Sequence, residues 1–338
     1  MKQIIKLTAA LVAFGAMGLQ AQELRSDHPD RYTVQKGDTL WDISEKFLQQ
    51  PWLWPEIWHA NEQIANPHLI FPGDLLRLVY IDGEPRIVLD RGVVKLGPTI
   101  RATSHEDAIS AIQLDEIREF FSNNRLATRD ELDAAPYMIA GPEKRIIVGA
   151  GDRLYARGDI PEGSQVFQVY TPSGDYVDPD TDEVLGVRAL ATGLARFQTS
   201  NGEVSTMRLE ESYREVSVGD VFLPLVQDSF ASTIFPSIPS GDIEGTIISV
   251  EGGVTNAGQF DVVAFNLGQE DGLKVGDLLG VLIKGELVRD RIAKDKVALP
   301  DEQTGLLMVF KTHEKMSFGL ILESERAIAV GYKVSSQF

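Results

Sequence analysis

The sequence predicts an α+β protein, in which a small module with two helices is followed by a mixed connecting region and two strand-rich repeats, each a small barrel or sandwich. Three observations support this prediction. All four tryptophans of the 338 residues lie between residues 41 and 58, inside a strand–helix–helix–strand pattern. From about residue 148 onward, short apolar runs alternate with Gly, Asp and Pro, which is typical of small β domains. Part of this stretch repeats itself at a spacing of 112 residues.

The composition excludes several classes of function. The formal net charge is -18, and so acidic a surface repels phosphate backbones, so we expect no nucleic-acid partner. The chain has no cysteine, which rules out disulfides, thiolate metal sites and thiol nucleophiles. No metal site and no other cofactor is predicted.

The N-terminus has the three-part pattern of a secretory signal peptide. Lys2 and Lys6 precede a short apolar run, and the small residue Ala21 follows it. We expect cleavage near Ala21, which removes residues 1–21; an uncleaved membrane anchor is the alternative. An exported, acidic and cysteine-free protein suits the periplasm of a Gram-negative bacterium.

Residues 30–80 are predicted to form the small module. A short alternating strand at 32–34 leads into a turn, where Gly37 supplies the backbone freedom that a tight turn needs. A second strand is expected at 75–79, after a loop rich in Asn, Pro and Gly.

Two helices are predicted between these strands. Leu40, Ile43 and Phe47 recur at helical spacing and predict one buried stripe. Pro51 ends this first helix, and Pro55 lies near the start of the second, where its missing N–H costs little.

The stretch 32–44, followed by the stretch 66–74, resembles the LysM domain. The segment between the helices is longer and richer in Trp and Pro than in a minimal LysM domain. The resemblance implies binding of N-acetylglucosamine-containing glycans, mainly peptidoglycan, in a shallow groove between two loops. In that groove Thr39 and backbone amides would meet acetamido groups, and Leu40, Ile70 and Phe71 would cover sugar faces. The glycan-binding residues that it implies are Gly37, Asp38, Thr39, Leu40, Pro67, His68, Leu69, Ile70 and Phe71.

Several of these residues have a purely structural alternative. Leu40 can serve only as core, and Asp38 can cap the first helix. For the tryptophans between the helices, packing and an exposed sugar platform are both open alternatives. These three are Trp52, Trp54 and Trp58.

Residues 84–148 are predicted to be a mixed α/β connecting region. A strand is expected at 86–94 and a short helix at 114–121. Thr128 with Glu131 forms a capping box, which predicts another short helix that ends before Pro136.

The two strand-rich units are predicted at 149–226 and 241–335, and they resemble each other. The stretch 193–219 matches the stretch 305–331 without gaps at a shift of 112. Common β-hairpin patterns without duplication are the alternative. The matched pairs include Gly193 and Gly305, Ser205 and Ser317, Leu209 and Ile321, Glu211 and Glu323, and Ser212 and Ser324.

The sequence predicts a protein that is not an enzyme. Its five histidines have no metal-binding spacing, and it has no P-loop and no nucleophile elbow. The acidic stretch 178–183 offers carboxylates to a cation, but a solvated hairpin tip is the simpler interpretation.

The order of signal peptide, LysM module and strand-rich region resembles the TsaP-like, secretin-associated family of type IV pilus systems. The stretches 51–58 and 299–310 carry this similarity, and the C-terminal region is also similar to the C-terminal domain of a flagellar ring protein. The resemblance implies a periplasmic protein that anchors an outer-membrane secretin to the cell wall, with a possible ring-like oligomer around it. A peptidoglycan-hydrolase partner or activator, and a scaffold of another envelope machine such as a flagellar ring, are the alternatives.

Overall fold

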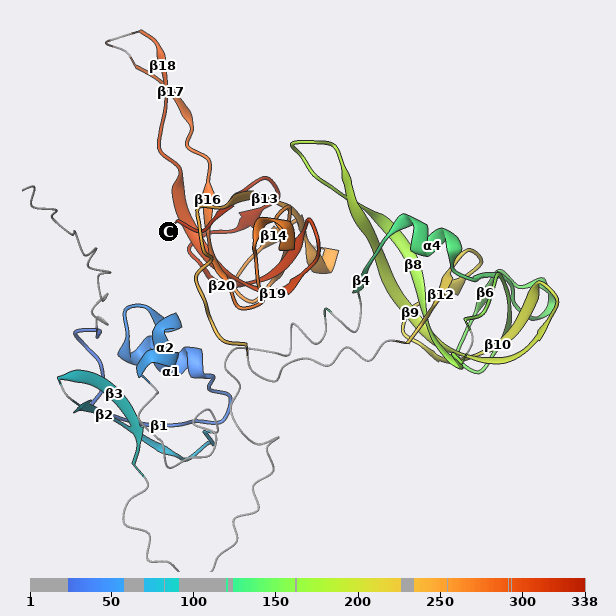
Figure 1. Ribbon diagram of the computed structural model, residues 1–338, viewed down its shortest axis with the longest axis horizontal. Helices are drawn as coiled ribbons and strands as arrows, with labels where there is room; N and C mark the ends of the chain where they lie inside the picture. Colours follow the sequence, from blue (N-terminus) through green and yellow to red (C-terminus); the bar gives the residue numbers. More distant parts are fainter. Residues whose placement is uncertain are drawn as a thin grey trace, which may run out of the picture. The chain divides into compact units, whose positions relative to one another are not determined.

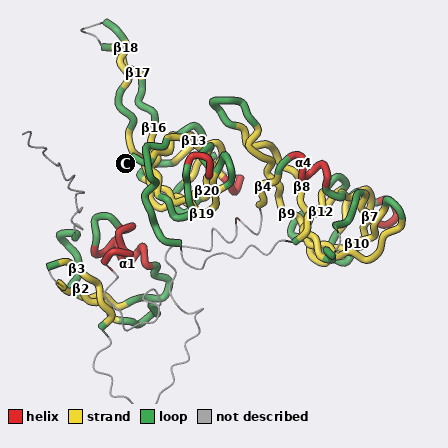
Figure 2. The backbone as a smooth tube through the Cα atoms, viewed as in Figure 1, coloured by secondary structure: helices red, strands yellow, loops and turns green. Residues whose placement is uncertain are grey.

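The computed structural model describes residues 24–57, 70–81, 83–90, 120, 124–161, 163–225, 234–253, 255–290, 292 and 294–337. They fall into two compact units, one made mainly of residues 24–90 and the other mainly of residues 120–337. Strands dominate the described chain, so the expected α+β class fits only roughly (Figure 2). Among the described residues, no helix is long and apolar enough to span a bilayer.

The first unit packs two short helices beside a three-stranded antiparallel sheet (Figure 1). The strand order is β1-β2-β3. The third strand falls where the sequence predicted the start of the connecting region, and instead it pairs with β2 along its whole length. The elements are β1 (Arg31–Thr33), α1 (Leu40–Phe47), η1 (Pro51–Leu53), α2 (Trp54–Ile57), β2 (Leu75–Ile81) and β3 (Glu84–Leu89).

The predicted helical stripe forms the core of this unit. Leu40, Ile43 and Phe47 are all buried. Trp54 is also fully buried, which decides in favour of packing for this residue. Trp52 is half-buried, with its ring centroid 6.4 Å from that of Trp41, whereas Trp58 lies outside the described residues.

The second unit contains two closed rings of six strands. In the first ring, which we call barrel 1, the order is β10-β7-β5-β12-β8-β9, and β9 pairs back with β10. β4 adds to the outer edge of β9. The elements are β4 (Asn124–Ala127), α4 (Arg129–Ala134), β5 (Tyr137–Ala140), η3 (Pro142–Lys144), β6 (Ile147–Val148), β7 (Arg153–Arg157), β8 (Val166–Val177), β9 (Val184–Asn201), β10 (Val204–Ser212), β11 (Val216–Ser217) and β12 (Val221–Pro224).

The second ring, barrel 2, has the order β13-β15-β20-β19-β16-β22 and is also closed. Replacing each strand of barrel 1 by its counterpart gives this same ring, and the small ribbon β6–β11 has its counterpart in β14–β21. The elements are β13 (Glu244–Val250), η4 (Glu251–Gly253), β14 (Asn256–Ala257), β15 (Val262–Phe265), η5 (Gln269–Asp271), β16 (Leu278–Ile283), β17 (Leu287–Arg289), β18 (Lys296–Ala298), β19 (Glu302–Thr312), β20 (Ser317–Ser324), β21 (Ile328–Ala329) and β22 (Lys333–Ser335).

The two barrels share local contacts as well as topology. Ser212 Oγ donates to the carbonyl of Arg214 at 2.7 Å, and Ser324 Oγ donates to that of Arg326 at 2.6 Å. The first barrel begins earlier than expected, at β5, before the predicted boundary at residue 149, whereas the second begins at β13, within the predicted range 241–335. The C-terminal part of the predicted connecting region therefore belongs to barrel 1.

The capped helix predicted before Pro136 is confirmed. It is α4, and Thr128 Oγ1 accepts a hydrogen bond from the backbone N–H of Glu131 at 3.1 Å. The helix predicted at 114–121 lies outside the described residues except for Phe120, whose ring centroid lies 4.8 Å from that of Phe318.

Candidate glycan-binding site

The first unit brings together the two loops that the sequence predicted to frame a groove. β1 and β2 pair in antiparallel register, so the end of β1 lies beside the start of β2. Val34 continues this ladder: its N–H donates to the carbonyl of Asp74 at 2.9 Å, and its own carbonyl accepts from Gly73 at 2.8 Å. Main-chain bonds of Val34, the residue before the loop at 35–39, therefore hold the start of this loop beside the loop at 70–74.

Each loop turns through a glycine in the left-handed region. Gly37 has φ of +99° and Gly73 has φ of +93°, where a side chain would be strained. The second turn is closed by Asp74, whose Oδ2 accepts from the N–H of Phe71 at 3.0 Å and whose N–H donates back to the carbonyl of Phe71 at 3.0 Å.

Burial divides the predicted contact residues into two groups. Thr39, Leu40 and Ile70 are 3%, 1% and 2% exposed, which favours a supporting role for their side chains. Gly37 is exposed, and Asp38 and Phe71 are partly exposed, so these can present main-chain groups and an aromatic ring to a sugar. The remaining predicted contacts lie outside the described residues, and glycan contact stays a prediction for the whole set. Those remaining residues are Pro67, His68 and Leu69.

Two stabilising features of this unit were not predicted. A segment before β1 packs on the end of α1, where the N–H of Arg25 donates to the carbonyl of Phe47 at 2.9 Å and Leu24 forms a bridge with Leu48. The Lys46 ammonium also lies 5.3 Å from the ring centroid of Tyr32, which links the helix to β1. Both contacts depend on three-dimensional packing, and no local sequence pattern encodes them.

Asp74→Ala is expected to loosen the loop at 70–74. The substitution removes the acceptor of the Phe71 N–H, and one such bond contributes about 0.5–1.5 kcal/mol. The unfolding midpoint of this unit should fall accordingly. Tryptophan fluorescence reports it selectively, because all four tryptophans lie between residues 41 and 58. Asp74→Asn keeps an acceptor oxygen and is the matched control; equal loss in both variants would contradict this role.

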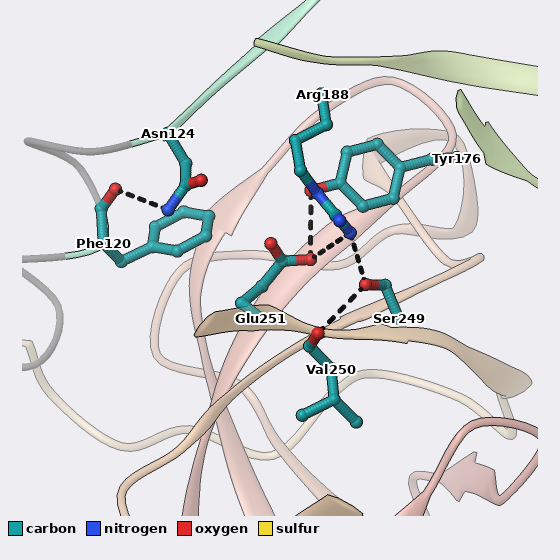
Figure 3. A network of polar contacts seen from close by, with 7 residues as sticks. All are labelled: Phe120, Asn124, Tyr176, Arg188, Ser249, Val250 and Glu251. Atoms are coloured by element: carbon teal, nitrogen blue, oxygen red, sulfur yellow. Dashed lines mark hydrogen bonds and ion pairs between the residues drawn. The ribbon is translucent and has the colours of Figure 1, made fainter. Parts of the chain in front are cut away.

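A second polar centre joins the two barrels within the second unit (Figure 3). Arg188 on β9 donates from Nη2 to Glu251 Oε1 at 3.0 Å and from Nε to Tyr176 Oη at 3.0 Å. Tyr176 Oη donates to the same Glu251 oxygen at 3.0 Å, and Ser249 accepts from Arg188. The Glu251 side chain is 4% exposed and that of Arg188 is 27% exposed, so the ion pair is largely shielded from water.

The electrostatics of this centre keep Tyr176 neutral. Burial, together with the adjacent Glu251 carboxylate, raises the pKa of Tyr176 well above its ordinary value. Its hydroxyl therefore stays a donor to Glu251 at any physiological pH. The Arg188 and Glu251 charges neutralise each other, and hydrogen bonds with their neighbours fix their orientation. This arrangement suits a structural contact between the barrels.

The acidic stretch 178–183 lies at the tip of the β8–β9 hairpin and also contacts barrel 2. Asp178 Oδ1 accepts from Asn266 Nδ2 at 3.2 Å, and Glu183 pairs with Lys315 at 2.6 Å. Within the described ranges, no group of three or more His, Cys, Asp or Glu side chains is arranged to hold a metal ion.

Comparison with known proteins identifies the first unit. The family model of the LysM domain matches residues 32–79. The chain is also similar to the protein named "Uncharacterized protein YqbP" of Bacillus subtilis (strain 168), with 42% identity over 60 residues. That match covers 15% of this chain and 27% of the relative, so the chain spans about a quarter of the relative's length. Residues 32–79 are therefore a LysM domain, a module that binds N-acetylglucosamine-containing glycans such as peptidoglycan.

Proposed function

We propose that this chain is a non-catalytic, periplasmic, peptidoglycan-binding protein that anchors an outer-membrane secretin, such as that of a type IV pilus, to the cell wall. The observation that carries the proposal is the LysM domain at residues 32–79, with its two candidate glycan loops bonded to each other through Val34. The paired barrels supply the docking part. In this proposal the LysM domain holds the wall and the paired barrels hold the machine.

The joint between the barrels supports a mechanical role. Tyr176, Arg188 and Glu251 connect β8, β9 and the end of β13, and Lys315 adds an ion pair with Glu183. These contacts make the second unit a single block with two barrels, which offers a larger docking surface than either barrel alone. A tether under load needs such a block to transmit force without opening.

The net charge of the chain limits the kind of force that can hold it to the cell wall. With residues 1–21 removed, the chain carries 30 Lys and Arg against 50 Asp and Glu, a net charge of -20. Peptidoglycan stems carry carboxylates, so long-range attraction does not help, and the contact must be short-range. Many copies around a symmetric ring would then combine weak single-site binding into firm attachment through effective concentration.

Sedimentation with insoluble peptidoglycan tests the wall-binding half. The full chain is expected in the pellet, and Phe71→Ala is expected to weaken binding by about tenfold, or about 1.4 kcal/mol, because a partly exposed ring at the groove is lost. Tyr80→Ala is the matched control: Tyr80 is 65% exposed on β2, the strand that follows this loop, and lies six residues past Asp74. A chain that stays in the supernatant, or equal loss in both variants, would refute the assignment of this groove.

Crosslinking in cells tests the secretin-docking half. A photo-reactive residue on the outer surface of barrel 2 is expected to capture a secretin subunit. In a strain that lacks the protein, twitching should fail while swimming persists. Loss of swimming with normal twitching would assign the protein to a flagellar ring instead.

A further inference from the structure

The two barrels carry equivalent hairpins that extend beyond the ring. We call residues 172–188 arm 1; they comprise the end of β8, the hairpin tip and the start of β9. We call residues 284–300, between β16 and β19, arm 2. The two arms have the same length and the same tip. Asp178 N–H donates to the carbonyl of Glu183 at 2.9 Å in arm 1, and Asp290 N–H donates to that of Asp295 at 2.9 Å in arm 2. They are therefore two copies of one element.

Arm 1 is docked on the outer wall of the neighbouring barrel. This wall consists of β13, β15 and β20 of barrel 2. Tyr176 packs edge-on against Phe318 of β20, with ring centroids 5.8 Å apart, and Arg188 pairs with Glu251 at the end of β13. The chain itself thus shows how an arm of this fold attaches to a barrel of this fold.

Arm 2 stands away from its own barrel (Figure 1). Leu287 is 68% exposed, Ile292 is 94% exposed and Leu299 is 45% exposed. Val288 and Val297 form a cross-strand pair and are 39% and 47% exposed. Several exposed apolar side chains on one projecting hairpin are the mark of a surface that another protein covers.

The outer wall of barrel 2 to which arm 1 binds, which we call the seat of an arm, has an exposed counterpart on barrel 1. The equivalent wall consists of β5, β7 and β10. On its outer face Tyr137 is 40% exposed and pairs with the exposed Arg157, and the partly exposed Tyr155 pairs with Thr206. An aromatic side chain therefore occupies this wall in both barrels, on β20 of barrel 2 and on β5 and β7 of barrel 1.

The contact of arm 1 with barrel 2 favours a second copy of this chain as the occupant, because it shows that an arm of this fold binds a barrel of the same fold. Arm 2 carries five Lys or Arg and three Asp or Glu, a net charge of +2, whereas arm 1 carries one and five, a net charge of -4. The wall on barrel 1 carries the exposed Arg153, Arg157 and Arg208, so the contact rests on the exposed apolar and aromatic side chains of the two surfaces and not on charge attraction. In such a copy, the seat on barrel 2 is already filled by its own arm 1, which leaves the seat on barrel 1.

We propose that arm 2 of one copy docks on the β5–β7–β10 wall of barrel 1 in a second copy. The two surfaces differ, so the contact is head-to-tail and each new copy offers another free arm. Repetition of such a contact gives a closed ring or an open filament, depending on the rotation between successive copies. This contact does not depend on glycan binding.

Paired single-cysteine variants of the full chain test the contact, because the chain has no cysteine of its own. Val288 corresponds to Tyr176, and Thr206 corresponds to Phe318, at the shift of 112. A Val288→Cys chain mixed with a Thr206→Cys chain should form a disulfide-linked dimer under mild oxidation. Leu287→Cys replaces Val288→Cys in the matched control, because neighbouring residues of a strand face opposite sides, and should crosslink to Thr206→Cys at least about tenfold less.

Sedimentation velocity provides the second readout. The unmodified chain should form larger species as its concentration rises, and both Val288→Asp and Tyr155→Asp should weaken this association by about tenfold or more. A chain that stays monomeric at high micromolar concentration would overturn the proposal. So would Val288→Cys chains that crosslink to one another more efficiently than to Thr206→Cys chains, because this would show that arms pair with arms.

Discussion

Arg188→Ala is expected to lower the free energy of unfolding of the paired barrels by about 3–5 kcal/mol, because it leaves a buried carboxylate without its cation. The Glu251 side chain is 4% exposed, and in this variant it would keep the hydrogen bond from the Tyr176 hydroxyl but lose the cation that neutralises its charge. Arm 1 should then detach from barrel 2. Hydrogen exchange measured by mass spectrometry should show faster exchange in β8, β9 and β13, which meet at this centre.

The controls for this prediction come from the chain itself. Arg196 pairs with Glu210 on barrel 1, but their side chains are 47% and 32% exposed, so Arg196→Ala should cost less than about 1 kcal/mol. Tryptophan fluorescence should stay unchanged in both variants, because it reports only the LysM domain. Restoration of stability by the apolar pair Arg188→Met with Glu251→Leu would identify the unpaired charge as the cause. Equal losses for Arg188→Ala and Arg196→Ala would contradict it.

The elements of the LysM domain were predictable because local patterns encode them. The spacing of Leu40, Ile43 and Phe47 is a helix period, and Pro51 and Pro55 separate the two helices. The pairing of β3 with β2 was not predictable in the same way. A strand at this position fits equally well beside β2 or in the next domain, and only tertiary packing decides.

The repeat was predictable from matched residues, but the closure of its strands was not. The shift of 112 aligns Gly193 with Gly305, and both glycines face the backbone carbonyl of a matched glutamate, Glu211 or Glu323. Because a larger residue would clash with these carbonyls, the glycine is needed at the same place in both barrels, and the repeat is visible in the sequence. The ring closes where β9 pairs with β10, and only one of the two arms is docked on a barrel. Both features depend on long-range contacts, which produce no periodic pattern in the sequence.

The candidate glycan site was predictable as two neighbouring loops, and less so as a set of contacts. The turn residues Gly37 and Gly73 are encoded by the conformation they must adopt. The burial of Thr39 and Ile70 is not encoded locally, because it depends on what packs over them. A family resemblance transfers loop positions more reliably than it transfers the exposure of each side chain.

The two barrel cores are expected to place their large side chains on different, non-equivalent strands. The substitution Gly319→Met should test this expectation. Met207 of barrel 1 corresponds to Gly319 of barrel 2 at the shift of 112. Ala156 corresponds to Phe265, because Ala156 pairs with Ser205 and Phe265 pairs with Ser317, the counterpart of Ser205. A Cβ atom on Gly319 would lie 2.7 Å from Leu307 Cδ1 and 3.2 Å from Phe265 Cε1. Gly319→Met should therefore overpack barrel 2 and cost about 1–3 kcal/mol or more.

Phe265→Ala should relieve this overpacking, although on its own it leaves a cavity and should cost about 3–5 kcal/mol. The double variant should be more stable than the sum of the two losses predicts, by about 1–3 kcal/mol, because the methionine fills space that the ring vacates. The reciprocal pair in barrel 1, Ala156→Phe with Met207→Gly, should show coupling of the same sign.

Chemical denaturation followed by far-UV circular dichroism measures these losses, since strands dominate that signal and the tryptophans again report the LysM domain separately. Additive losses in both barrels would mean that the two positions do not share space. Coupling in both would show that the two copies of the fold kept one interior and filled it from opposite strands: a large residue on β10 with a small one on β7 in barrel 1, and the reverse on β20 and β15 in barrel 2. Such an exchange leaves the outer walls free to diverge, which allows one arm to be docked while its counterpart stays exposed.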